Sequence, residues 1–177
     1  IPPSISMVVY GVVTDTSVGH LRSALETFRG LGRYAETALP LLNLGIVYQK
    51  SGEWQRSLEH YREAERVFRQ VADPLGLART ALGMGNVARL QRRFSDAERI
   101  FTEALEGARR QSARREEVLA IEFLGELEFD RERPEAALAH YEEALAAAER
   151  MAPDGDLIVE LERRRAEALG SSGRLEE

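Results

Sequence analysis

The chain has 177 residues, of which 44% are hydrophobic and 31% charged, a balance that excludes an intrinsically disordered protein. Its net charge of −6 disfavours nucleic acid as the main partner. It has no cysteine, which excludes disulfides, thiolate metal sites and cysteine nucleophiles and is compatible with the cytoplasmic location that we expect.

Residues 1–13 are rich in β-branched side chains and poor in helix formers. We expect an irregular, strand-like arm, a degenerate helix or an appended segment there. The apolar run around Met7–Val9 is too short for a membrane span, so we expect no membrane partner. Because the chain opens on Ile1, we expect that its natural beginning is missing.

Residues 14–32 are predicted to contain the second helix of a partial repeat, at about residues 17–30. Residues 33–72 form repeat 1, with helices at about 34–50 and 54–71 separated at Gly52. Residues 73–112 form repeat 2, with helices at about 75–91 and 96–111. Asp73 and Pro74 are expected to cap its first helix, and Ser95 to Glu98 read as a capping box for its second.

Residues 113–152 form repeat 3, with helices at about 114–130 and 135–151, the second started by Pro134. Residues 153–177 form a partial repeat 4 with a helix at about 156–170. Because this repeat stops at Glu177, we expect the chain to be a piece of a longer protein.

A period of forty residues connects these segments. It aligns Gly45 with Gly85 and Gly125, and it aligns the bulky aromatics Tyr61, Phe101 and Tyr141 sixteen positions later. Small residues lie between and after them, at Ser57, Ala97, Ala137, Ala64, Ala104 and Ala144. Glycine inside a helix costs roughly 1 kcal/mol relative to alanine. Three glycines at one spacing therefore predict that another helix packs closely there.

The pattern Leu44-Gly45-x-x-Tyr48-x-x-x-Gly52-x-Trp54-x-x-Ser57-x-x-x-Tyr61-x-x-Ala64 resembles the tetratricopeptide repeat family. Met84-Gly85 and Leu124-Gly125 continue it, whereas Arg92 and Glu132 replace the glycine between the helices. The long period is similar to the subgroup found in large bacterial transcription regulators and peptide-binding scaffolds. The resemblance implies an all-α fold, an α-solenoid of antiparallel helical hairpins in a right-handed superhelix, with Trp54 in an aromatic packing slot.

The resemblance also implies that one face of each repeat's first helix lines a ligand groove. We call it the first-helix face. In this sequence its candidate residues are Leu42, Ile46, Gln49, Arg79, Leu82, Asn86, Arg89, Glu122, Glu126 and Phe129, with Leu39 and Leu119 beside them. Two other interpretations stay open. The apolar members could pack against the preceding repeat or the N-terminal arm, and the charged members could form an ordinary solvated surface.

We therefore expect a scaffold module that binds a protein or peptide in this groove. The alternative is an effector-sensing or oligomerisation module of a bacterial transcription regulator, and homo-oligomer formation stays open. No enzyme activity, catalytic residue, metal or cofactor is expected. Gly83 to Ala88 matches a dinucleotide-binding fingerprint, but it falls inside a predicted helix without a preceding strand. His20, His60 and His140 share one repeat slot, which spreads them along the stack rather than around a metal.

Overall fold

The structure is a computed structural model, and it describes residues 5–152 and 155–172. Over these residues the chain forms helices and no strand. The α-helices are α1 (Ile5–Gly30), α2 (Ala38–Lys50), α3 (Trp54–Gln70), α4 (Pro74–Leu90), α5 (Phe94–Gln111), α6 (Arg114–Asp130), α7 (Pro134–Met151) and α8 (Asp156–Ser171). A 3-10 turn, η1 (Tyr34–Thr37), precedes α2. The expected all-α class is confirmed.

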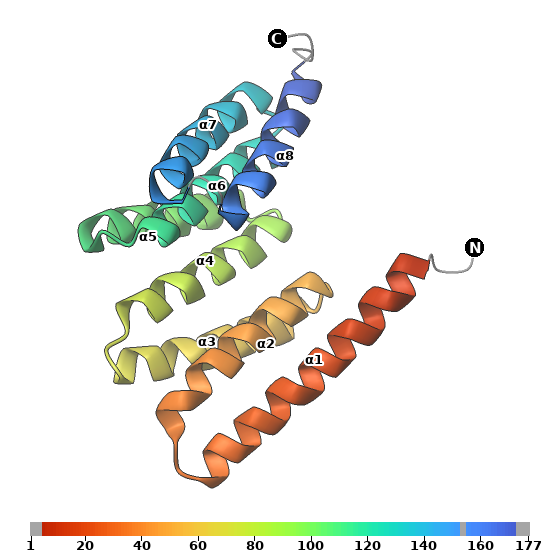
Figure 1. Cartoon of the computed structure of the whole chain (residues 1–177), viewed down its shortest axis with the longest axis vertical. Helices are drawn as coiled ribbons and strands as arrows, with labels where there is room; N and C mark the ends of the chain where they lie inside the picture. Colours follow the sequence, from red (N-terminus) through yellow and green to blue (C-terminus); the bar gives the residue numbers. More distant parts are fainter. Residues whose placement is uncertain (1–4, 153–154, 173–177) are drawn as a thin grey trace. The chain divides into compact units, whose positions relative to one another are not determined.

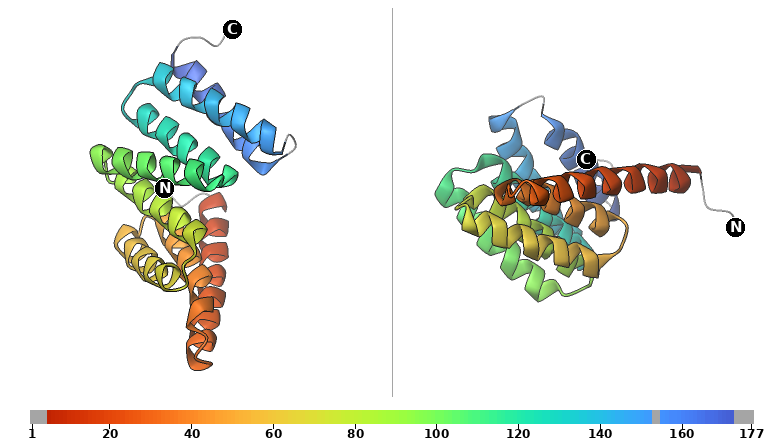
Figure 2. Two further views of the ribbon diagram at one scale, coloured as in Figure 1. Left: turned by 90° about the vertical axis from the view of Figure 1, so that its left-hand side faces the viewer. Right: turned by 90° about the horizontal axis from the view of Figure 1, so that it is seen from below.

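The helices fall into two compact units, residues 1–83 and 84–177, and the division lies within α4. In the first unit α2 packs against α3, and α1 lies along α2. In the second unit α5 contacts α6, α6 contacts α7, and α7 contacts α8 (Figures 1 and 2). Sequential neighbours thus pack as hairpins, which is the contact pattern of a helical-repeat solenoid.

The turns between helices repeat every twenty residues. Positive φ angles occur at residues 32, 52, 72, 92, 112 and 132, with values between 53° and 77°. After each of them the same hydrogen bond closes the turn, at 2.8 to 3.0 Å. The donors are the amides of Arg33, Glu53, Asp73, Arg93, Ala113 and Arg133, and the acceptors are the carbonyls of Phe28, Tyr48, Phe68, Ala88, Ala108 and Glu128, in that order. This is the bond of a Schellman motif, which ends a helix on a left-handed residue. The repeat is therefore present in the backbone as well as in the sequence.

The aligned glycines lie where an aromatic ring meets the first helix of each repeat. A Cβ placed on Gly85 would lie 2.6 Å from the Phe101 ring, and one on Gly125 would lie 2.6 Å from the Tyr141 ring. In repeat 1 the Tyr61 ring contacts Gly45 in the same way. These three rings are almost completely buried. The predicted close approach is confirmed, and the group that fills the space is the aromatic ring itself.

Two helix starts differ from the predicted ones at the N-terminal side. α1 begins at Ile5 rather than near residue 17, so residues 5–13 are helical and only residues 1–4 of the predicted arm lie outside the described part. β-branched residues lower helix propensity by well under 1 kcal/mol each, which is too little to break a helix. The predicted helix from residue 34 begins as η1, because Pro40 has no N–H to bond the carbonyl of Glu36.

The capping predictions for α4 and α5 have opposite outcomes. Asp73 Oδ1 accepts a hydrogen bond of 3.0 Å from the amide of Gly76, so Asp73 caps α4 as expected. The capping box at Ser95 is wrong, because α5 begins at Phe94 and its cap, Arg93, makes no side-chain bond. The left-handed turn at Arg92 determines where α5 starts, and Ser95 therefore lies inside the helix.

In the first unit Trp54 differs from its expected surroundings, whereas His60 has the kind of role that was expected of it. Trp54, expected in the core, is 36% exposed at the start of α3, because the Tyr61 ring fills the space beneath the hairpin. His60 stacks on Tyr48 with ring centroids 5.3 Å apart, and the Arg22 guanidinium donates a hydrogen bond of 2.8 Å to the Tyr48 hydroxyl. His60 thus has a packing role in the α2–α3 hairpin.

Candidate functional site

The first-helix face of the first unit is partly open. Leu42 and Leu82 are buried, whereas Ile46 is 37% exposed and Leu39 is 55% exposed. Gln49 accepts a hydrogen bond of 2.9 Å from the Tyr61 hydroxyl, so its amide is tied to the hairpin core. Arg79 lies exposed on α4. Of the candidates in this unit, Ile46 and Arg79 are those whose side chains reach the surface most.

A hollow of about 400 Å³ opens beside Ile46, between α1 and α2. Leu21, Ile46 and Val47 form its apolar lining, and His20 and Asn43 contribute polar edges. Leu39, Asn43 and Ile46 follow one another at helical spacing, so the exposed Leu39 continues this surface by one turn. Exposed apolar side chains that gather beside a hollow are typical of an interaction site.

The same face of the second unit holds a network of ion pairs centred on Arg89. Its guanidinium lies 2.5 Å from Glu126 Oε2 and 2.6 Å from Asp130 Oδ2, and it donates to Asn86 Oδ1 at 2.9 Å. The Arg89 side chain is only 12% exposed. Arg89, Asn86 and Glu126, all candidates from the sequence, are therefore brought together, and they bind one another.

Arg164 of α8 closes this network from the other side. It contacts Glu126, Glu122 at 3.1 Å and Glu160 at 3.1 Å. Glu122 and Glu126 are 5% and 3% exposed. The network thus joins α4, α6 and α8, the first helices of successive repeats, and it connects candidates of the first-helix face to Asp130, Glu160 and Arg164. Phe129, the remaining candidate, is half-buried against the core around α7.

The network holds four carboxylates and two guanidinium groups, from Glu122, Glu126, Asp130, Glu160, Arg89 and Arg164. Burial and the neighbouring Glu126 raise the pKa of Glu122 to about 7, although Arg164 opposes the shift. Burial also raises the pKa of Glu126, against the lowering effect of Arg89 and Arg164. Glu122 therefore carries a proton for part of the time near neutral pH.

Sequence reasoning missed Arg164, Glu160 and Asp130, although one signal was present. Counting by forty residues, Arg164 occupies the slot of Leu44, Met84 and Leu124. An arginine in an apolar slot needs a buried carboxylate beside it, because an unpaired charge is costly to bury. That argument would have paired Arg164 with the glutamates of α6.

Neither a metal site nor a membrane span emerges from the part of the chain that the structure describes. Within residues 5–152 and 155–172, no three His, Asp or Glu side chains are grouped so that they could hold a metal ion. No helix among those residues has the length and apolar character needed to cross a membrane. The fingerprint-like segment Gly83 to Ala88 lies within α4, where it cannot form a phosphate-binding turn.

The fold and this face define a helical-repeat protein of antiparallel hairpins. Residues 14–70 and 36–110 match a family model of the tetratricopeptide repeat, and residues 118–155 match a second model of that repeat. These matches cover more than half of the chain, which belongs to the tetratricopeptide repeat family. Repeats of this family generally mediate protein–protein interactions and are typically not catalytic.

Among solved structures, the chain is similar to the crystal structure of BtubC (BKLC) from P. vanneervenii. The two share 15% sequence identity with a TM-score of 0.62, over 92% of this chain and 85% of that chain. At this identity the similarity supports the fold alone. No curated protein matches the chain.

Proposed function

We propose that the chain is a scaffold module that binds a protein or peptide segment on its first-helix face. The observation that carries this proposal is the apolar hollow between α1 and α2, which Ile46 lines and Leu39 extends. The general role of the family in protein–protein interactions supports the same assignment. Such a module needs no cofactor, and we propose that it works in the cytoplasm.

The ligand we propose is an amphipathic segment that places apolar side chains against Leu39 and Ile46. Leu39 and Ile46 are seven residues apart on α2, so they lie on one face of the helix. A row of apolar side chains of this kind can bind the apolar face of a helix or an extended peptide. Leu42, Leu82 and Gln49 would support the row from beneath. Arg79 would add a charged contact at the edge.

In the second unit the proposed ligand contacts differ, because Arg89, Asn86, Glu122 and Glu126 are engaged with one another. A ligand there would meet the outer members of the network, Asp130 and Glu160, whose side chains are 30% and 43% exposed. Phe129 would offer an apolar contact beside them. The buried members would hold the shape of the face rather than touch the ligand.

The test begins with peptides selected from a display library on the whole chain. The affinity of the best peptide is then measured by calorimetry for the wild type and for Leu39→Glu and Ile46→Glu. Each substitution should weaken binding at least tenfold, which corresponds to about 1.4 kcal/mol. The charged side chain cannot be buried under an apolar anchor without a partner.

Val71→Glu is the matched control, because Val71 is 45% exposed in the same unit and receives the same change. It should leave the affinity within about twofold, and all three variants should keep the wild-type melting temperature to within a few degrees. Equal loss of binding in Val71→Glu and Leu39→Glu would contradict the proposed site.

A further inference from the structure

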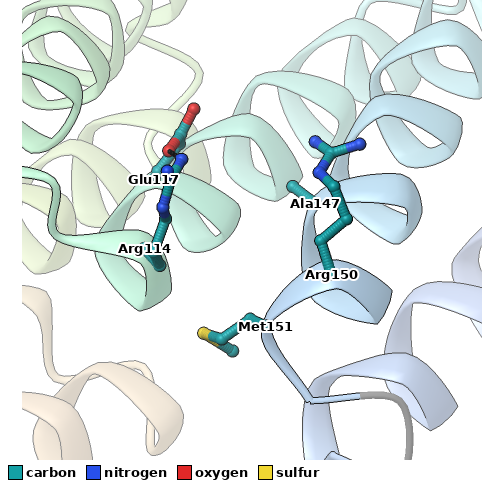
Figure 3. A pocket seen from close by; sticks show the side chains of 5 residues that line it. All are labelled: Arg114, Glu117, Ala147, Arg150 and Met151. Atoms are coloured by element: carbon teal, nitrogen blue, oxygen red, sulfur yellow. Dashed lines mark hydrogen bonds and ion pairs between the residues drawn. The ribbon is translucent and has the colours of Figure 1, made fainter.

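A small hollow of about 140 Å³ lies between the start of α6 and the end of α7. Figure 3 shows Arg114 and Glu117 on the α6 side and Ala147, Arg150 and Met151 on the α7 side. A water molecule takes up roughly 30 Å³ in the liquid. The hollow therefore has room for several waters or for one side-chain carboxylate.

The lining of this hollow has more positive charge than its carboxylate can neutralise. Arg114 lies 3.5 Å from Glu117, and Arg109 contacts the same carboxylate at 3.2 Å. Strong pairs of this kind have N···O distances of about 2.7–2.9 Å. Arg109 also pairs with Glu143 at 2.7 Å, whereas Glu117 is within ion-pair distance of Arg114 only at 3.5 Å, and the Arg114 side chain stays 71% exposed.

Arg150 adds a second guanidinium from α7 that makes no ion pair with the residues the structure describes. Each guanidinium presents five N–H donors in a planar fork that fits a carboxylate. Met151, 36% exposed, and Ala147 place apolar surface beside these donors. The hollow thus combines solvent-exposed guanidinium donors with an apolar wall.

We propose that this hollow binds an acidic side chain, a glutamate next to an apolar residue, of a protein partner. The guanidinium groups of Arg114 and Arg150 hold the carboxylate, and Met151 packs against the apolar neighbour. A single carboxylate fits the volume, whereas a nucleic-acid polyanion would be repelled by the net charge of −6. The site lies outside the first-helix face, so it would act as a second contact point of the scaffold.

The test uses the whole chain with its arginine side chains labelled with ¹⁵N, observed by NMR. The probe is a short peptide, blocked at both ends, with one central glutamate beside a leucine. The same peptide with glutamine in place of glutamate is the matched probe, and inorganic phosphate is a third. The glutamate peptide should shift the Arg114 and Arg150 signals saturably, and the glutamine peptide should not.

The double variant Arg114→Gln/Arg150→Gln should weaken binding of the glutamate peptide at least tenfold, while Arg62→Gln, at an exposed arginine of α3, should not change it. Leu39→Glu should also leave it unchanged, which separates this site from the first-helix face. The proposal is overturned if the double variant binds as tightly as the wild type, if the glutamine peptide binds equally well, or if phosphate alone shifts the two signals.

Discussion

Gly85 makes the packing of the repeat sensitive to a single methyl group. Gly85→Ala would place a Cβ 2.6 Å from the buried Phe101 ring, in a contact that backbone or ring must relieve by moving. Overpacking of this kind typically costs about 1–3 kcal/mol, which exceeds the helix propensity that alanine gains. Chemical denaturation of the variant should therefore show a lower free energy of unfolding.

Gly107→Ala is the matched control within the same unit. It lies inside α5, and a Cβ there would meet only the end of the Arg110 side chain, at 3.9 Å. The variant should gain up to about 1 kcal/mol from helix propensity. The same substitution is thus predicted to lower stability at residue 85 and to raise it at residue 107. A gain in stability at both positions would show that the ring does not pack on Gly85.

Glu122 couples the stability of the second unit to pH. Its pKa is raised to about 7 in the folded chain and lies near 4.3 in an unfolded one. Between these values the folded state keeps a proton that the unfolded state loses, so the free energy of unfolding falls as the pH rises through this window. The stabilisation is complete below about pH 4 and is lost above about pH 7.

Glu122→Gln should remove this dependence, because glutamine stays neutral and its carbonyl oxygen can still accept the bond from Arg164. The free energy of unfolding of the variant minus that of the wild type should increase by about 2 kcal/mol when the pH is raised from 5.5 to 8. Denaturation curves of both proteins at several pH values measure this difference in the free energy of unfolding. A difference that does not change over this range would mean that Glu122 is ionised throughout.

The turns show what the sequence reveals about the elements and what it does not. Gly52 was recognisable as a break, since glycine tolerates the left-handed conformation. Ala72, Arg92, Ser112 and Glu132 adopt it as well, although nothing in their side chains marks them. Their conformation follows from the helices on either side, whose packing fixes where each hairpin must turn. Helix spans could thus be predicted from periodicity, but their starts at Ile5 and Phe94 could not.

Ala72→Gly tests this description of the turns. Alanine at φ 53° is strained by about 1–2 kcal/mol, and glycine removes that strain at a smaller cost in unfolded-state entropy. The variant should be more stable by about 0.5–1 kcal/mol in thermal or chemical unfolding. Ala152→Gly, where φ is −158°, should instead lose about 0.4–1 kcal/mol. A loss at residue 72 as large as that at residue 152 would contradict the turn geometry.

Across the whole molecule, the repeat was predictable because each slot has a physical requirement that recurs every forty residues. The first-helix face was less predictable, because the same slot holds Ile46, Asn86 and Glu126. The residues of this slot alone do not separate an open surface from a buried network. That distinction depends on Arg164, which reaches the slot from the next repeat.

The central proposal is that a ligand lies along α2. The most direct measurement is paramagnetic broadening of methyl NMR signals by a library-selected peptide that carries a spin label. We predict strong broadening at Leu39 and Ile46 and little at Val71, which is exposed in the same unit. Broadening that is strongest at Val71, or equal at all three residues, would contradict binding on the first-helix face.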